Sequence, residues 1–282
     1  MIQLGKKNIL KVLRDTSVGM FLGDQEDNTN DVLLPNKYVP RNLAIGEDIE
    51  VFVYKDSEDR IVATTLTPLI QLGEFACLQV VAVSDSGAFL NWGLEKDLLV
   101  PHRQQNEKLQ EGDWAIVYLY LDPSTDRLAA SCKLGRYFEA ENIALTEGQE
   151  VNLLAYKSTD LGLNVVINNQ YSGLIYHNEI FKRVAWGDTF KGYIKQIRPE
   201  GGGIDVSLRP LGYQHVEPTA QTILEKLKAN DGFLGLSDKS DAYDIMEMLE
   251  MSKKTFKKAV GLLYKQHLIS LHDDGIRLIN NS

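Results

Sequence analysis

One pattern occurs three times along this chain, and this repeat limits the possible folds more than any other feature, because repeated segments fold as copies of one unit. The first recurring mark is a glycine that opens an apolar segment, with spacings of 68 and 75 residues, at Gly19, Gly87 and Gly162. The second is a glycine before an acidic residue, with spacings of 66 and 75 residues, at Gly46, Gly112 and Gly187. Two marks in the same order and at nearly the same spacing indicate three units of one kind.

Each unit consists of short runs rich in β-branched and aromatic residues, separated by Gly, Asp, Asn and Ser. Runs of this length with period-two alternation are typical of antiparallel strands, and about five of them per unit suit a small barrel. The glycine of the first mark fits a place where a strand coils sharply or where two backbones approach closely. The glycine and acidic residue of the second mark indicate a turn before the fourth strand.

Beyond residue 210 the period of the apolar pattern changes from two to 3.6 residues, which indicates helices. Pro218 is expected to open a first helix, Ser240 to cap a second and Ser252 to cap a third. Two short strands joined by a turn at residues 273–275 follow. Three helices and a terminal β-hairpin predict a winged helix.

The predicted fold class is therefore multidomain and mainly β, with three tandem OB-fold, five-stranded barrels followed by an α/β winged-helix domain. The expected domains are residues 1–66, 67–137, 138–210 and 215–282. Three residues are interpreted as packing residues rather than binding platforms, namely Trp92, Trp114 and Trp186.

The repeated unit resembles the S1 RNA-binding domain, the OB-type repeat of bacterial ribosomal protein S1. The likeness is carried by Gly87-Ala88-Phe89-Leu90 and by the closing run Ile204-Asp205-Val206-Ser207-Leu208. Three S1-like units followed by a winged helix resemble, as a whole, the conserved virulence factor B family. That resemblance implies an RNA-binding regulator of gene expression at the RNA or translation level, with single-stranded RNA held on the barrel faces.

The resemblance to S1 domains implies three RNA-facing positions in each unit. They are the aromatic residue of the Gly-Ala-Phe step, the position that carries a histidine after a Gly-Leu step, and the arginine before the last strand. The candidates carried over in this way are Phe21, Arg60, Phe89, Arg127, Tyr176 and the neighbouring His177. The third unit departs from the pattern, because Asn164 replaces the aromatic residue and Gly203 replaces the arginine.

Charge distinguishes the units further, because phosphate contacts hold a nucleic-acid strand in position. The whole chain has a net charge of −9, which argues against binding by bulk electrostatics. Residues 1–66 include eight basic and eleven acidic residues, residues 71–135 five and nine, and residues 148–210 seven and six. The third unit is therefore the favoured RNA surface, through Lys182, Arg183, Lys191, Lys195 and Arg198.

The predicted third helix of the winged-helix domain is basic, with no acidic residue between Ser252 and Gln266. In DNA-binding winged helices this helix enters the major groove. Its candidates for contact with duplex nucleic acid or a partner protein are Lys253, Lys254, Lys257 and Lys258. Two alternatives to RNA binding stay open, a DNA-binding transcription regulator acting through the winged helix and a protein-interaction scaffold.

No motif argues for catalysis, because the five histidines lack metal-ligand spacing and neither a nucleophile motif nor a paired-carboxylate motif is present. We therefore expect a non-enzymatic protein without a metal or cofactor. The N-terminal residues lack a signal-peptide pattern, and no apolar run approaches the roughly 18 residues of a membrane span. A cytoplasmic location without a membrane partner is the resulting expectation.

Overall fold

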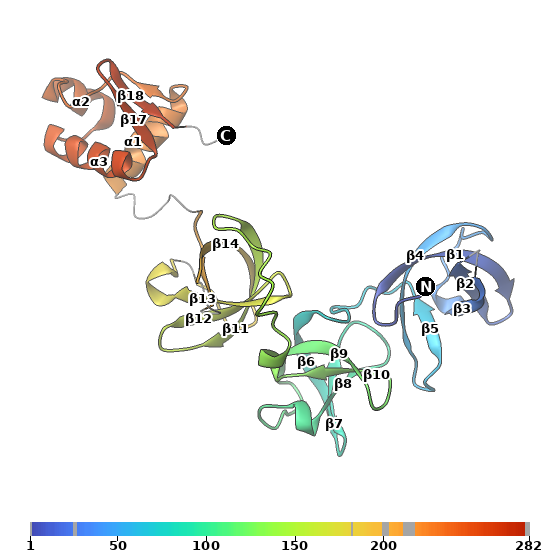
Figure 1. Cartoon of the computed structure of the whole chain (residues 1–282). Helices are drawn as coiled ribbons and strands as arrows, with labels where there is room; N and C mark the ends of the chain where they lie inside the picture. The colour runs from blue at the N-terminus through green and yellow to red at the C-terminus, as the bar shows by residue number, and fades with distance from the viewer. Residues whose placement is uncertain (1, 25–26, 182, 199–202, 211–217, 280–282) are drawn as a thin grey trace.

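The computed structural model describes residues 2–24, 27–181, 183–198, 203–210 and 218–279. Three β domains follow one another along the chain, and a helical domain with a small sheet comes last (Figure 1). The first barrel consists of β1 (Lys7–Thr16), β2 (Gly19–Asp24), β3 (Asp27–Pro35), β4 (Asp48–Lys55) and β5 (Ile61–Thr64).

The second and third barrels repeat this order of strands. The second consists of β6 (Phe75–Ser84), β7 (Gly87–Asn91), β8 (Leu98–Pro101), β9 (Trp114–Asp122) and β10 (Arg127–Ser131). The third consists of β11 (Glu150–Ser158), β12 (Gly162–Ile167), β13 (Tyr171–Tyr176), β14 (Thr189–Ile197) and β15 (Ile204–Ser207). Short 3-10 helices are η1 (Asn36–Tyr38), η2 (His102–Gln104), η3 (Leu134–Arg136) and η4 (His177–Glu179).

Strand order confirms the predicted OB topology. The first and third domains are closed barrels with the orders β1-β2-β3-β5-β4 and β11-β12-β13-β15-β14, in which the third and fifth strands pair in parallel. The second domain is a five-stranded sheet in the equivalent order β10-β9-β6-β7-β8, and its end strands β8 and β10 lie next to each other. A bulge interrupts the pairing of the first two strands at the same place in every unit.

The first recurring glycine lies where the third strand crosses closely over the second, as the sequence predicts. A Cβ atom there would lie 2.0–2.2 Å from a carbonyl oxygen, a distance that no side chain tolerates. The three pairs of glycine and carbonyl are Gly19 with Leu34, Gly87 with Val100, and Gly162 with Ile175. Because only glycine fits, the recurrence of this residue follows directly from the barrel geometry.

The second recurring glycine forms the turn before the fourth strand, which is also confirmed. Its φ angle is +90° at Gly46, +91° at Gly112 and +86° at Gly187, a region that favours glycine. In every unit its amide donates a hydrogen bond of 2.8–2.9 Å to a carbonyl of the first strand. The acidic residue that follows accepts a hydrogen bond from the amide three residues earlier, which closes the turn.

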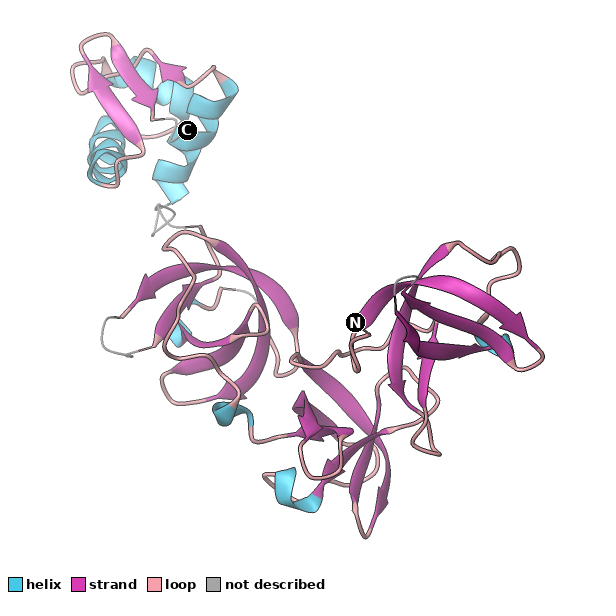
Figure 2. Ribbon diagram, turned by 45° about the vertical axis from the view of Figure 1, so that its right-hand side comes forward, coloured by secondary structure: helices cyan, strands magenta, loops and turns pink. Residues whose placement is uncertain are grey.

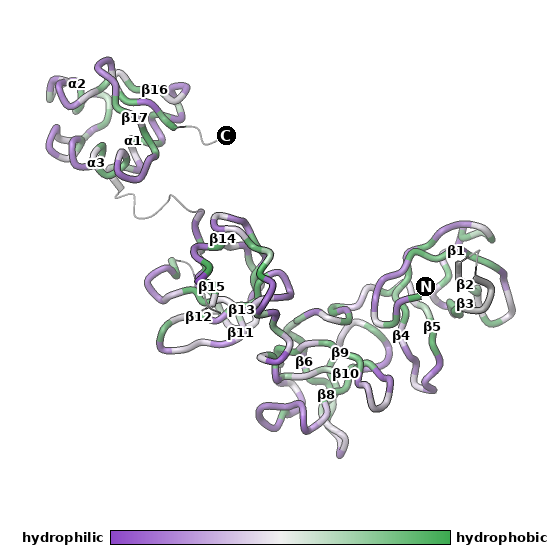
Figure 3. The backbone as a smooth tube through the Cα atoms, in the orientation of Figure 1, coloured by the Kyte–Doolittle hydropathy of each residue, from purple (hydrophilic) through white to green (hydrophobic). Residues whose placement is uncertain are grey.

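The fourth strand of the first barrel contributes to two cores, because successive side chains of a strand point to opposite faces. Val51 and Val53 belong to the core of the first barrel. Phe52 and Tyr54 point the other way and join the core cluster of the second barrel, beside Trp92. This continuous apolar run appears as an apolar stretch of β4 in Figure 3.

The equivalent strands of the other two barrels, β9 and β14, differ from each other in their outward-facing side chains. On β9, Ile116 and Tyr118 face away from their own barrel and pack against Leu154 and Val166 of the third. On β14 the equivalent outward positions are polar, at Lys191, Tyr193 and Lys195. The docking face of the first two barrels is therefore replaced by a basic face in the third.

The C-terminal domain is a winged helix, as predicted (Figure 2). It consists of α1 (Pro218–Ala229), β16 (Phe233–Leu234), α2 (Ala242–Leu249), α3 (Lys253–Lys265), β17 (Ile269–His272) and β18 (Gly275–Leu278), with the sheet order β16-β18-β17. Ser252 caps α3 by accepting a hydrogen bond from the Thr255 amide, which confirms its predicted role. The prediction for α2 was wrong by one residue, because Asp241 rather than Ser240 accepts the capping hydrogen bond from Tyr243. Among the described residues, no helix is both long and apolar enough to cross a membrane.

Candidate nucleic-acid interface

Strand register places a triplet of outward side chains at the same position of every barrel. The triplets run across the first, second and third strands, and none of their nine side chains is buried. They are Arg14-Phe21-Leu33, Ala82-Phe89-Leu99 and Lys157-Asn164-Leu174. The structure thus brings Phe21 and Phe89 to equivalent, half-buried positions on the face that OB barrels commonly use for single strands.

The three triplets differ in chemistry. In the first barrel the Arg14 guanidinium lies 4.0 Å from the centre of the Phe21 ring and pairs with Asp31 at 2.6 Å. The second barrel presents the Phe89 ring beside an alanine, without such a cation. In the third barrel the lysine of the triplet remains, but an amide stands in place of the ring. The first barrel therefore offers a base a ring with a cation, the second barrel a ring alone, and the third barrel a cation alone.

The candidate arginines at the start of the last strand are held by carboxylates. Arg60 donates to Asp56 through Nε at 2.9 Å and Nη2 at 2.7 Å, and it lies 2.8 Å from Glu58. Burial alone would raise the pKa of Asp56, but hydrogen bonds from Arg60 and from two backbone amides outweigh burial and lower it. Arg127 pairs with Asp59 of the first barrel, so this side chain bridges two domains.

In the third barrel Tyr176 and Arg198 are brought together. Arg198 donates to both carboxylate oxygens of the buried Asp205, at 2.8 and 2.9 Å, and also to the Tyr176 hydroxyl. The hydrogen bond to Asp205 is the main reason that the pKa of Arg198 is raised. His177 is exposed, and its Nε2 lies 2.9 Å from the carbonyl oxygen of Thr159.

The remaining cations of the third barrel lie on and before β14. Arg183 is exposed in the connection that precedes this strand, whereas Lys182 lies outside the described residues. The two lysines of the outer face of β14 form ion pairs with neighbouring carboxylates. These pairs are Lys191 with Glu150, at 3.4 Å, and Lys195 with Glu179.

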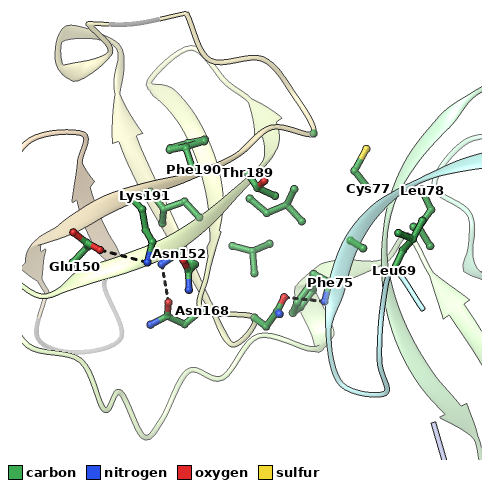
Figure 4. Close-up of a pocket in the computed structure, with 16 residues that line it drawn as sticks. Leu69, Phe75, Cys77, Leu78, Glu150, Asn152, Asn168, Thr189, Phe190 and Lys191 are labelled. Carbon is green, nitrogen blue, oxygen red and sulfur yellow. Dashed lines mark hydrogen bonds and ion pairs between the residues drawn. The ribbon is translucent and has the colours of Figure 1, made fainter. Parts of the chain in front are cut away.

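Lys191 also lines a pocket of about 1020 Å³ between the second and third barrels, shown in Figure 4. The pocket is crossed by backbone-to-amide hydrogen bonds from Asn152 to Asn168 and from Phe75 to Asn169. Among the described residues that line it, the charged ones are Lys191 and Glu150, which pair with each other. The pocket therefore offers little net charge to a phosphate.

The tryptophans correct the sequence interpretation. Trp92 is a packing residue as predicted, since it is only 3% exposed between the first two barrels. Trp114 and Trp186 are not, because 56% and 44% of these residues remain exposed. Both line a second groove between the second and third barrels, of about 770 Å³. The sequence signal that could have indicated this exposure is the position of each indole beside a polar Gly-Asp turn, at residues 112–114 and 186–188.

A row of six aromatic rings links the second barrel to the third. Neighbouring ring centres lie 4.1–6.0 Å apart, within the usual range of aromatic pairs. The rings, in order, belong to Tyr120, Tyr137, Tyr118, Phe75, Phe138 and Tyr156. Because two of them come from the connection between the domains, the connection itself packs the two barrels together.

The lysines of α3 line up on one side of the helix, opposite its apolar face. Phe256, Val260 and Leu263 are buried in the domain core, as the spacing predicts. Of the four candidate cations, Lys253 is half-buried and the others are exposed, namely Lys254, Lys257 and Lys258. Within the described residues, no group of three or more His, Cys, Asp and Glu side chains is arranged to hold a metal ion.

Comparison with known families agrees with these features. The S1 domain model matches residues 4–66 and 72–133, and the CvfB-like winged helix domain model matches residues 221–278. The third barrel lies outside the two S1 matches, although its strand order is the same. S1 domains and winged helices are nucleic-acid-binding families, so both ends of the chain carry domains of that kind.

The chain also resembles whole proteins over most of its length. It is 29% identical over 268 residues to the uncharacterized protein YitL of Bacillus subtilis, covering 93% of this chain and 89% of that protein. It is 28% identical to conserved virulence factor B of Staphylococcus epidermidis and 26% identical to that of Staphylococcus aureus, covering 84% of this chain and 82% and 81% of theirs. A crystal structure of a multidomain protein with nucleic acid binding domains from Streptococcus pneumoniae is 23% identical, with 98% of both chains covered and a TM-score of 0.46. In sequence and in domain composition, the chain is therefore similar over most of its length to the conserved virulence factor B proteins, and it carries a CvfB-like winged helix domain.

Proposed function

We propose that this protein binds single-stranded RNA on its barrel faces and regulates gene expression at the RNA or translation level. The observation that carries the proposal is the equivalent placement of Phe21 and Phe89 in two barrels that match the S1 domain model. Partly exposed rings on this face provide surfaces on which bases can stack. The remaining members of the proposed contact set on the barrels are Arg60, Arg127, Tyr176 and His177.

The third barrel is proposed to hold the phosphates. Its basic residues Lys191 and Lys195 occupy the outer face of β14, where the first two barrels instead carry apolar docking residues. The Glu150 partner of Lys191 does not prevent binding, because an exposed ion pair of this kind contributes only about 0–1 kcal/mol and a phosphate can replace the carboxylate. The pair of Lys195 with Glu179 is partly buried, so Lys191 is the more available of the two lysines. Arg183, Arg198 and Lys182 complete this proposed surface.

The proposed role is that of a binding protein without a catalytic step, a cofactor or a membrane partner. An action on cellular RNA requires a cytoplasmic location, which is therefore part of the proposal. The winged helix offers a second candidate function, contact with duplex nucleic acid or with a protein. The observation that favours it is the exposure of Lys254 and Lys257 on α3. In DNA-binding winged helices, the equivalent helix lies in the major groove.

The proposal is tested by titrating the full chain against labelled single-stranded RNA homopolymers, with duplex DNA as the comparison, at two salt concentrations. Fluorescence anisotropy should report tighter binding to RNA, and the affinity should fall as salt rises because phosphate contacts release counterions. Replacing both rings, Phe21→Ala with Phe89→Ala, should weaken RNA binding roughly tenfold or more.

The matched control is Ile9→Ala, which removes an exposed apolar side chain from the part of β1 that pairs with β4. This control should bind RNA as the parent chain does. Equal affinity for RNA and duplex DNA, lost on replacing Lys254 and Lys257, would favour the winged-helix alternative. Failure to bind either nucleic acid would refute the proposal and favour a protein-interaction scaffold.

A further inference from the structure

The groove between the second and third barrels that contains the two exposed tryptophans is called here the tryptophan groove. Trp114 is the first residue of β9 in the second barrel, and Trp186 lies in the turn before β14 in the third. Both rings therefore line one groove only because the two barrels are packed together. Beside them, the groove is lined by the cations Lys133, Arg136 and Lys157.

Exposure of both indoles sets this groove apart from ordinary packing. Removing a large apolar ring from water lowers the free energy. Two exposed rings on one groove therefore mark a binding surface. The indole Nε1 of Trp186 donates a 2.9 Å hydrogen bond to the Tyr156 carbonyl, which holds that ring in place. A ring held in advance loses little conformational freedom when a ligand stacks on it.

Charge complementarity indicates the kind of ligand. The tryptophan groove has three cationic lining residues and one acidic one, Glu107. The charged residues described in the lining of the larger pocket at the same junction are Lys191 and Glu150, which pair with each other. Rings together with cations are the combination that holds single-stranded nucleic acid, through stacked bases and neutralised phosphates.

The groove also continues onto the third barrel. Lys157, one of its lining residues, pairs in register with Asn164 on β12. Asn164 occupies the position of the ring that the other two barrels carry, so the third barrel lacks its own stacking residue there. Trp186 lies next to the same strand pair in space, since the amide of the following residue, Gly187, donates a 2.8 Å hydrogen bond to the carbonyl of Ala155 on β11.

The equivalents of Trp186 in the other units are Ile45 and Glu111, which precede the same turn glycine. Neither is aromatic, so the indole is a specific feature of the third unit. We propose that the tryptophan groove is a stacking site for single-stranded RNA, which passes from Trp114 and Trp186 onto the β12 face of the third barrel. This inference rests on the proposed RNA-binding function and adds a site at a junction between barrels.

The test uses the full chain and labelled oligouridine, with anisotropy as the readout. Trp114→Ala and Trp186→Ala should each weaken binding roughly tenfold, as expected for the loss of one stacked base. Trp186→Phe keeps a ring and should retain most of the affinity. The matched control is Tyr243→Ala on α2, which removes a 73% exposed ring and should leave affinity unchanged. Circular dichroism should show parent-like folding for all variants.

Intrinsic fluorescence provides a second readout. Unlabelled oligouridine should quench the tryptophan emission of the parent chain, because bases stack directly on the exposed indoles. In the double variant Trp114→Ala with Trp186→Ala, only the buried Trp92 remains, and quenching should disappear.

The outcomes separate this site from the general function. Parent-like RNA affinity of the double variant overturns the groove proposal and leaves the RNA-binding proposal intact. If that variant keeps its RNA affinity but binds an oligoglutamate peptide more weakly than the parent, the groove belongs to an acidic protein partner and the proposal is overturned. Absence of RNA binding by the parent chain itself refutes both proposals.

Discussion

The two junctions between barrels both use the fourth strand of the preceding barrel, β4 at the first and β9 at the second. They differ in whether their tryptophans are buried or exposed. At the first junction Trp92 is buried against Phe52 and Tyr54, with ring centres 5.7 and 6.3 Å away. At the second, Trp114 and Trp186 remain exposed on a groove. Identical topology thus yields one closed junction and one open junction.

The difference arises from what fills the space beside the fourth strand. At the first junction the rings of β4 contact the next barrel directly. At the second, Tyr137 and Phe138 of the connecting segment stack against Tyr118 and Phe75, so the connection contributes part of the contact. Grooves of about 1020 and 770 Å³ remain between these barrels. A junction packed partly by its linker keeps surface available for a ligand.

The largest effect is expected from Trp92→Ala, which should lower the free energy of unfolding by about 3–5 kcal/mol because it leaves a cavity between two barrels. The exposed residues behave differently, and Trp114→Ala or Trp186→Ala should each cost less than about 1 kcal/mol. Urea unfolding followed by circular dichroism measures all three. Equal losses would contradict the distinction between a closed and an open junction.

A smaller effect is expected from Phe138→Ala, which removes the ring between Phe75 and Tyr156 and should cost about 2 kcal/mol. The variant should also expose Cys77, a half-buried thiol of the second junction whose pKa is raised by burial. Faster alkylation of Cys77 by iodoacetamide, followed by mass spectrometry, is the expected result.

Cys132 serves as the internal control for this experiment. Burial raises the pKa of its thiol to about 11, so it carries little thiolate at neutral pH and should react slowly in parent and variant. Folding favours the neutral thiol, so this contribution to stability is complete below the unfolded pKa of about 8.5 and is lost as the pH rises through 11. Trp92→Ala should leave the alkylation of Cys77 unchanged, because it acts at the other junction.

The sequence predicted those features that depend on local geometry. The glycines at positions 19, 87 and 162 are required by a close approach inside each barrel, so their recurrence identified the fold. The cap of α3 at Ser252 likewise depends on neighbouring backbone atoms. The basic residues Lys191 and Lys195 were also predicted as candidates, but their place on the outer face of the fourth strand became clear only from the structure.

Features that depend on neighbouring domains were not predicted. Trp114 and Trp186 were interpreted as packing residues, but their exposure depends on the space left between two barrels. The ion pair of Arg127 is similarly non-local, because Asp59 is 68 residues away and in another domain. No periodicity within one unit reveals either relation.

The smallest expected effect concerns this ion pair between the first two barrels. Since Arg127 and Asp59 are both exposed, Asp59→Asn should change the free energy of unfolding by about 1 kcal/mol or less. If Arg127 contacts RNA, the same variant frees its guanidinium and should tighten RNA binding, by up to about fivefold. Arg127→Gln should weaken binding instead.

The charge-matched control is Glu247→Gln on α2, which also removes one negative charge but lies outside the barrels. Tighter RNA binding by both variants would indicate an effect of net charge alone. Tighter binding by Asp59→Asn only, abolished when Arg127→Gln is added, would assign RNA contact to this arginine. The closed junction would then also contribute to the RNA surface, through an ion pair at its rim rather than through its buried rings.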